Sequence, residues 1–250
     1  MTLEDIKKTL DNELSIRNSF NELSYEKPDP LLVARRYNNE YIAMICAMFS
    51  YGNAKQIVKF LDTLDFEILD KSEDEIVTLL QKHYYRFQKP YDVIMIFITI
   101  KRLKSVDSIE NIFSDGYKKN ENILDGLWNL ISILKDINKY SSHGYNFLTS
   151  SVPKKLSSAG TYKRYMMYLR WMIRSDNIDL GLWTKIPSSA LLMPLDTHTF
   201  HVSQRIGLLK RKSYDLKAVL ELSDTLRSFD PNDPIKYDFA IYRLGQEGKL

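Results

Sequence analysis

Residues 193–211, with the sequence MPLDTHTFHVSQRIGLLKR, indicate the fold and the function of this chain more strongly than any other stretch. Pro194 favours an extended approach, and Asp196 stands where a helix should begin, so its carboxylate can accept the first free backbone N–H groups. We expect this helix to run to Ile206 and to end at Gly207. Taken alone, Asp196 is most simply interpreted as a helix N-cap with no further role.

The composition is typical of a soluble globular protein built mostly from helices. The chain has 250 residues, of which 44% are hydrophobic and 27% charged, with nine Gly and eight Pro. Long segments repeat apolar residues at helical spacing, which predicts an all-α fold. No apolar run approaches the roughly 20 residues of a membrane span, and residues 1–10 are charged and amphipathic rather than a secretory signal. We therefore expect a cytoplasmic protein without a membrane partner.

Positive charge is concentrated around the 193–211 segment, although the net charge is only +3. Residues 151–217 hold 12 Lys and Arg against four Asp and Glu, whereas residues 1–150 hold 19 against 22. Such a patch suits a polyanion such as nucleic acid, although a solvated basic face gives the same pattern. The one cysteine, Cys46, allows neither an internal disulfide nor a cysteine-rich metal cluster, and we expect it to pack as a small hydrophobic side chain.

Apolar periodicity predicts helices along most of the chain. Residues 144–147 and 152–155 are expected to be irregular, and a helix start is predicted at Ser72 by the sequence Ser-Glu-Asp-Glu. We expect one lobe of about residues 40–145 and another formed by about 1–39 and 146–250. The predicted helices include 3–23, 31–51, 55–64, 91–103, 108–117, 123–137, 213–229 and a last helix that ends at 244.

Lys163 is a candidate nucleophile because of its predicted place at a helix start. Small residues at 157–160, followed by an amphipathic pattern, place that start near Thr161. Lys163 then lies in the first turn, where the positive end of the helix dipole and the neighbouring Arg164 both disfavour the ammonium form. Burial would lower the pKa of Lys163 further and make its amine a usable nucleophile. A surface lysine that contacts solvent or phosphate is the alternative.

Three other places carry groups that suit a ligand. Tyr51-Gly52-Asn53 can present backbone N–H groups and an amide side chain, or be a glycine helix end. The run HYYRFQ at 83–88 can stack on bases, or its rings can fill a core between the lobes. Asp238 and Tyr242 are four residues apart on one helix face. Asp238 could bond a base edge beside a stacked Tyr242, or be a solvated carboxylate beside a half-buried tyrosine.

The motif around Asp196 resembles that of a known enzyme superfamily. Residues 194–198, PLDTH, and 202–208, VSQRIGL, are similar to the PVDTH…RVSNRLGL stretch of endonuclease III and of the helix-hairpin-helix (HhH-GPD) DNA glycosylases. Residues 163–170, KRYMMYLR, and 238–245, DFAIYRLG, resemble segments of the archaeal-type 8-oxoguanine glycosylases and of a related bacterial branch. Residues 48–53 resemble, more loosely, an early LLSAQ stretch of the superfamily.

The resemblance implies a two-lobed helical fold with a cleft between the lobes, and excision of 8-oxoguanine from double-stranded DNA by a monomer that also cleaves the abasic strand. It assigns the nucleophile to Lys163 and the catalytic carboxylate to Asp196, 33 residues further on. It further implies substrate contacts from Asp238, Tyr242, Gly52 and Asn53, and DNA contacts from Gly160, Arg164, His198 and Arg205.

The sequence departs from the superfamily in two places, and three alternative functions remain compatible with it. The LPGxG hairpin is replaced by LSSAG at 156–160, and the four-cysteine iron–sulfur loop is absent, so no cofactor is expected. A monofunctional glycosylase for another lesion would use Asp196 without depending on Lys163. A noncatalytic DNA-binding protein would bind with steep salt dependence. A metal hydrolase could use Asp196, His198 and His201, although no fourth ligand is evident.

Overall fold

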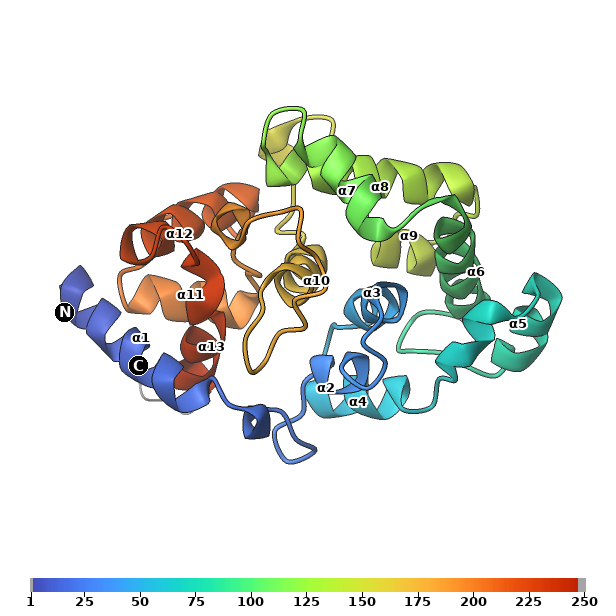
Figure 1. Ribbon diagram of the computed structural model, residues 1–250, viewed down its shortest axis with the longest axis horizontal. Coiled ribbons are helices and arrows are strands. Elements are labelled where there is room, and N and C mark those ends of the chain that lie inside the picture. Colours follow the sequence, from blue (N-terminus) through green and yellow to red (C-terminus); the bar gives the residue numbers. More distant parts are fainter. Residues whose placement is uncertain (1, 247–250) are drawn as a thin grey trace. The chain divides into compact units, whose positions relative to one another are not determined.

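The computed structural model describes residues 2–246, and within this range it contains α-helices and short 3-10 helices but no β-strand (Figure 1). The expected all-α class is thereby confirmed. The chain forms two compact units. Unit 1 consists of the described residues up to Glu22 and from Pro153 onward, and unit 2 of Leu23–Val152. None of the helices within residues 2–246 has the length and apolar character needed to cross a membrane.

Unit 1 joins the first helix of the chain to the last. Helix α13 packs against both α1 and α11 (Figure 1). The Tyr237 hydroxyl, just before α13, donates to Asp11 of α1 at 2.8 Å, and Arg243 of α13 pairs with Glu22 at 2.8 Å. The helices of unit 1 are α1 (Leu3–Arg17), α10 (Lys163–Ile173), α11 (Thr197–Arg205), α12 (Leu216–Phe229) and α13 (Asp238–Gln246), with 3-10 turns at Phe20–Glu22, Leu156–Ser158, Ser188–Ala190 and Pro234–Tyr237.

Unit 2 is built around one long helix, α6 (Pro90–Val106), whose apolar residues are buried on nearly every side, as its sequence predicts. Helices α7 and α8 pack closely on each other because Gly126 leaves room for the ring of Phe113, from which an added Cβ would lie only 2.6 Å away. The other helices are α2 (Leu31–Ala34), α3 (Glu40–Met48), α4 (Ala54–Leu61), α5 (Glu73–Leu80), α7 (Ile109–Tyr117), α8 (Ile123–Ile137) and α9 (His143–Thr149), with a 3-10 turn at Phe66–Asp70.

Side-chain caps set the helix starts where the sequence carries a local signal. The Ser72 hydroxyl accepts from the backbone N–H of Glu75, and the Glu75 carboxylate accepts from the backbone N–H of Ser72, which forms the predicted capping box of α5. The Asn122 side chain caps α8, and α8 begins and ends at the residues that the sequence predicts. These starts are fixed by residues within one helical turn.

Several segments differ from the expected helices. The helix expected at 213–229 begins at Leu216, because Asp215 caps it, and the helix expected at 55–64 ends at Leu61. Residues 31–51 form two helices, α2 and α3, because Asn38 adopts a left-handed conformation (φ 45°) and Asn39 then caps α3. The first helix ends at Arg17 rather than continuing to residue 23. Residues 144–147, expected to be irregular, lie in α9, which starts where the Ser142 hydroxyl accepts from a backbone N–H at 2.9 Å.

Candidate functional site

Asp196 caps helix α11, as the sequence predicts. Its carboxylate accepts a hydrogen bond from the backbone N–H of Thr199 at 2.8 Å. The helix ends at Arg205, and Gly207 follows with the left-handed φ of 84° that favours glycine. Leu195 beside the cap is buried, whereas Asp196 itself is half-buried. The carboxylate is thus fixed by the backbone and still reachable from solvent.

Lys163 is the first residue of helix α10 and is half-buried. Its Nζ lies 3.4 Å from the sulfur of Met167, one turn along the helix. The N-cap position is held by Tyr162 in a left-handed conformation (φ 48°), without a capping hydrogen bond from its side chain. A left-handed residue other than glycine costs about 1–2 kcal/mol, so other contacts must hold this turn.

Asp238 brings Lys163 and Asp196 into one electrostatic cluster in unit 1. Asp238 opens α13, is buried, and forms an ion pair with Arg170. Burial raises the pKa of Asp238, the positive charges of Arg170 and Lys163 oppose that shift, and the negative charge of Asp196 adds to it. Two of the predicted site residues, Lys163 and Asp196, therefore act electrostatically on a third, Asp238. A solvated Asp238, the simpler sequence interpretation, is wrong because the side chain is buried against Arg170.

Tyr242 and His198 pack α13 against α11. Their ring centroids are 5.8 Å apart in an edge-to-face arrangement. Gly245 allows this approach, since an added Cβ would lie 2.6 Å from Nε2 of His198. The Tyr242 hydroxyl accepts a hydrogen bond from Gln246 at 2.8 Å. Both residues were predicted to contact substrate or DNA, and the structure places them beside the Asp196 cap of the same unit.

Tyr214, which the sequence did not single out, joins the two helix starts. The Thr161 hydroxyl donates to the Tyr214 oxygen at 3.3 Å, and the Tyr214 hydroxyl donates to the backbone carbonyl of Leu195 at 2.9 Å. The Tyr214 side chain is 41% exposed overall, but partial burial of its hydroxyl raises its pKa. The hydroxyl therefore keeps its proton, and its role as a donor, at neutral pH. No local pattern around residue 214 signals this bridge, because both partners are distant in the sequence.

A network of buried charges continues from Arg170, the ion-pair partner of Asp238, to other residues of unit 1. Arg170 donates to Asp179 at 3.0 and 3.1 Å, and Arg174 pairs with Asp179 and, at 2.9 Å, with Asp233. Asp179 has no exposed side-chain surface. This network was not predicted from the sequence. Its signal was Arg170 and Arg174, which are four residues apart in and directly after the apolar part of α10, where buried cations require buried carboxylate partners.

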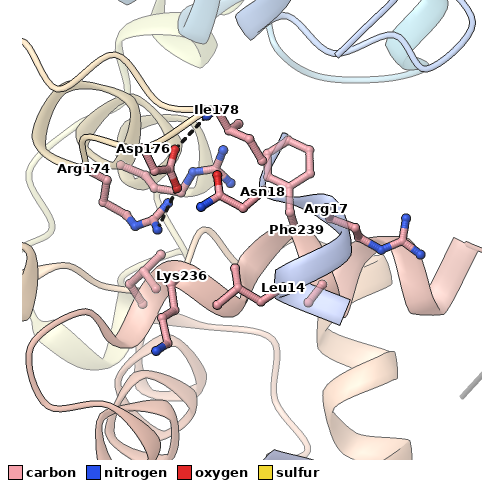
Figure 2. A pocket seen from close by; sticks show the side chains of 11 residues that line it. Leu14, Arg17, Asn18, Arg174, Asp176, Ile178, Lys236 and Phe239 are labelled. Carbon is pink, nitrogen blue, oxygen red and sulfur yellow. Dashed lines mark hydrogen bonds and ion pairs between the residues drawn. The ribbon is translucent and has the colours of Figure 1, made fainter. Parts of the chain in front are cut away.

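A small pocket of unit 1 lies beside this network (Figure 2). Arg174 and Asp176 face it and form an ion pair at 2.9 Å, and Asp176 also accepts from the backbone N–H of Ile178 at 2.8 Å. Its charged side chains are already paired within unit 1, so the pocket offers no unpaired charge to a ligand. It is lined by Leu14, Arg17, Asn18, Arg170, Arg174, Asp176, Ile178, Ile235, Lys236, Phe239 and Ala240, none of which was predicted as a site residue.

The predicted DNA contacts of unit 1 lie near the starts or ends of its helices. Gly160 is exposed before α10, where an added Cβ would meet no atom within 4 Å. Arg164 is half-buried in the first turn of α10, and Arg205 is exposed in the last turn of α11. His201 is also exposed. Residues 2–246 contain no group of three or more His, Cys, Asp or Glu side chains placed to hold a metal ion.

The predicted substrate contacts Gly52 and Asn53 belong to unit 2. Gly52 has a φ of 101°, and an added Cβ would lie 2.0 Å from Nη1 of Arg86, so the guanidinium covers the glycine. Asn53 caps α4, accepting from the backbone N–H of Lys55 at 3.0 Å. The helix-end interpretation of Gly52 needs correction, because α3 already ends at Met48.

An aromatic cluster lies beside Gly52 in unit 2. The ring centroid of Tyr51 is 5.8 Å from that of Phe87 and 4.7 Å from that of Phe147. The Arg86 guanidinium lies 5.1 Å from the centre of the Tyr51 ring. Phe87 and Phe147 are exposed. Tyr85, in contrast, is buried, and its hydroxyl donates to the Tyr51 carbonyl at 2.7 Å. The run at 83–88 therefore divides its rings between the surface and the interior of unit 2.

Comparison with known proteins assigns a family but no activity. Residues 29–247 match the family described as "Protein of unknown function (DUF2400)", and the chain belongs to that family. A search of curated proteins found no match. A search of solved structures found none either.

Proposed function

We propose that this member of the DUF2400 family is a DNA glycosylase of the helix-hairpin-helix type, which excises 8-oxoguanine from duplex DNA and cleaves the abasic strand. The observation that carries the proposal is that one side chain links two helix starts in unit 1. Lys163 opens α10, Asp196 caps α11, and one tyrosine hydroxyl joins the segments that lead to them. The motif around Asp196 supplies the reaction class.

In the proposed reaction, the damaged nucleotide first leaves the base stack, which costs a few kcal/mol and is least costly at a damaged pair. The ammonium of Lys163 gives a proton to Asp196, and the resulting amine attacks C1′ of the sugar while the bond from C1′ to the base breaks. The base departs with that electron pair and takes up the proton from Asp196, which then accepts a second proton from the attacking nitrogen. Opening of the sugar ring transfers this proton to O4′ and gives a Schiff base, from which loss of a C2′ proton breaks the bond from C3′ to oxygen and expels the 3′ phosphate.

Asp196 has two roles in this scheme. Its negative charge stabilises the positive charge that develops on the sugar as the base leaves, and its oxygen accepts the proton of Lys163. Capping of α11 supports both roles because it fixes the carboxylate before the substrate arrives. The basic stretch 151–217 suits the phosphates of the duplex. The proposed contacts of Gly160, Arg164 and Arg205 lie in that stretch.

Borohydride trapping tests the role of Lys163. The wild type should give a covalent adduct on a duplex that contains 8-oxoguanine, and Lys163→Gln should give none. Lys155→Gln is the matched control, since Lys155 is an exposed lysine eight residues earlier in the same basic stretch. The proposal fails if the wild type forms no adduct or if Lys163→Gln keeps it. Base release that survives in Lys163→Gln would indicate a monofunctional enzyme instead.

Substitution of Asp196 by asparagine tests the role of its negative charge without removing the helix cap. Asparagine caps helices about as well as aspartate, so Asp196→Asn should keep the stability of the protein while it slows adduct formation about 100-fold or more. Asp65→Asn is the matched control, because Asp65 caps the 3-10 turn at Phe66–Asp70 in unit 2 by accepting from the backbone N–H of Glu67 at 3.0 Å. Single-turnover rates and unfolding midpoints would be measured for both variants. Equal rates in the two would remove Asp196 from the chemistry.

A further inference from the structure

Tyr214 occupies a position from which one side chain contacts the approaches to both helix starts. Its partner Thr161 stands two residues before Lys163, and its partner Leu195 stands immediately before Asp196. Its ring also packs edge-to-face on Phe200 of α11, with centroids 5.5 Å apart. The negative charge of Asp196 acts on the Tyr214 hydroxyl. Thus the tyrosine is anchored to α11 while it holds the segment before α10.

The segment before α10 requires such an anchor. The left-handed backbone of Tyr162 is strained, and Gly160 has open space where a side chain would be. Two hydrogen bonds tie this segment to residues 214–216: the Thr161 bond to Tyr214, and the bond from the Leu216 backbone N–H to the Ala159 carbonyl at 3.1 Å. The strained turn that precedes Lys163 is therefore held from the start of α12.

The anchor is itself fixed. Asp215, the neighbour of Tyr214, caps α12 by accepting from Ala218 at 3.1 Å, and it forms an ion pair with Arg211. These local contacts hold the backbone on both sides of Tyr214. A fixed backbone with one hydroxyl between two partners gives the bridge a defined length, which is what the relative placement of two reacting groups requires.

We propose that Tyr214 is a positioning residue, whose hydroxyl sets the place of Lys163 relative to Asp196 by joining Thr161 to Leu195. The part of this proposal that concerns reaction rate rests on the proposed function. Loss of the hydroxyl lets the Tyr162 turn relax and moves the amine away from the carboxylate, without removing any group that binds DNA.

Tyr214→Phe tests the bridge, because phenylalanine keeps the ring and its contact with Phe200. Tyr41→Phe is the matched control, since the Tyr41 hydroxyl also donates to a backbone carbonyl, that of Asp107, but within unit 2. Three quantities would be measured: the single-turnover rate of borohydride-trapped adduct on a duplex with an abasic site, the Kd for that duplex, and amide hydrogen exchange. The abasic site removes base recognition from the measurement.

For Tyr214→Phe we expect a rate about tenfold or more slower, with Kd within about twofold of the wild type. Hydrogen exchange should become faster in both residues 159–166 and residues 195–200, and Tyr41→Phe should change none of these. Thr161→Val should give a similar loss of rate, and the double variant should add little to it. Such non-additivity would identify the Thr161–Tyr214 bond as the origin of the effect.

An unchanged rate, or a loss of rate matched by an equal loss of affinity, would overturn the positioning role. Unchanged exchange in both segments would overturn the bridge itself. If the wild type forms no adduct at all, the proposed function fails, and hydrogen exchange of Tyr214→Phe still decides whether Tyr214 holds the two segments. The two failures are therefore distinguishable.

Discussion

Unit 1 and unit 2 bury different kinds of side chain. Unit 2, residues 23–152, has only one buried charged residue, Asp92, and its pairs Arg36–Asp62 and Arg102–Glu73 are partly exposed. Unit 1 buries a set of charges, which comprises Arg17, Glu22, Arg170, Arg174, Asp179, Asp238 and Arg243. Buried ion pairs add little net stability because desolvation offsets their attraction, but breaking one is costly. Unit 1, which carries Lys163 and Asp196, is thus the unit in which buried ion pairs hold charged side chains in place.

The largest effect is expected from Asp179→Asn in unit 1. The substitution keeps the shape of the side chain but leaves Arg170 and Arg174 buried without their shared carboxylate. Removal of one partner from a buried pair costs about 3–5 kcal/mol. Chemical denaturation, followed together with hydrogen exchange in α10, would measure the loss. A change below about 1 kcal/mol would show that the charges of unit 1 are no more important to stability than a surface pair.

Leu127→Ala probes the apolar interior of unit 2. Leu127 has no exposed surface, and its truncation should lower the free energy of unfolding by about 3 kcal/mol. Cys46 offers a local readout, because its thiol is fully buried and burial raises its pKa, so it reacts with thiol reagents only when unit 2 opens. Labelling of Cys46 should accelerate more in Leu127→Ala than in Asp179→Asn. Equal acceleration would mean that the two interiors do not unfold separately.

The smallest effect is expected from the exposed ion pair between Glu73 and Arg102 in unit 2. Glu73→Gln should cost about 1 kcal/mol or less, since both side chains are about 40% exposed and water screens their attraction. The hydrogen bond from Arg102 lowers the pKa of Glu73. The contribution of Glu73 is therefore present above its unfolded pKa and disappears as pH falls through its folded pKa. Denaturation at pH 7 and at pH 3 should show a smaller difference between wild type and variant at pH 3 than at pH 7.

Features of the fold that depend on neighbours in sequence were predictable. The Asp196 cap, the Ser72 capping box and the bounds of α8 all follow from side chains within a turn of the helix end. The break between α2 and α3 also had a local signal, the pair Asn38-Asn39, because asparagine tolerates the left-handed backbone and caps helices. This signal was overlooked because apolar residues recur at helical spacing across residues 31–51.

Features of the candidate site that depend on distant residues were not predictable. Whether Asp238 is solvated or buried is decided by Arg170, 68 residues earlier. Tyr214 gains its importance from Thr161 and Leu195, which approach it only in the folded unit. The sequence could place Lys163 and Asp196 at helix starts, but the groups that fix their placement are side chains without any motif of their own.

The packing of α1 against α13 has a consequence for synthesis of the protein on the ribosome. Ile6 and Leu10 of α1 are buried in unit 1, yet α13 is made only after the whole of unit 2 and the rest of unit 1 have left the ribosome. Unit 2 can fold as soon as its own residues emerge, whereas the apolar face of α1 must wait for its partner. Throughout that interval the nascent chain exposes the apolar face of α1, which is the kind of surface that chaperones bind.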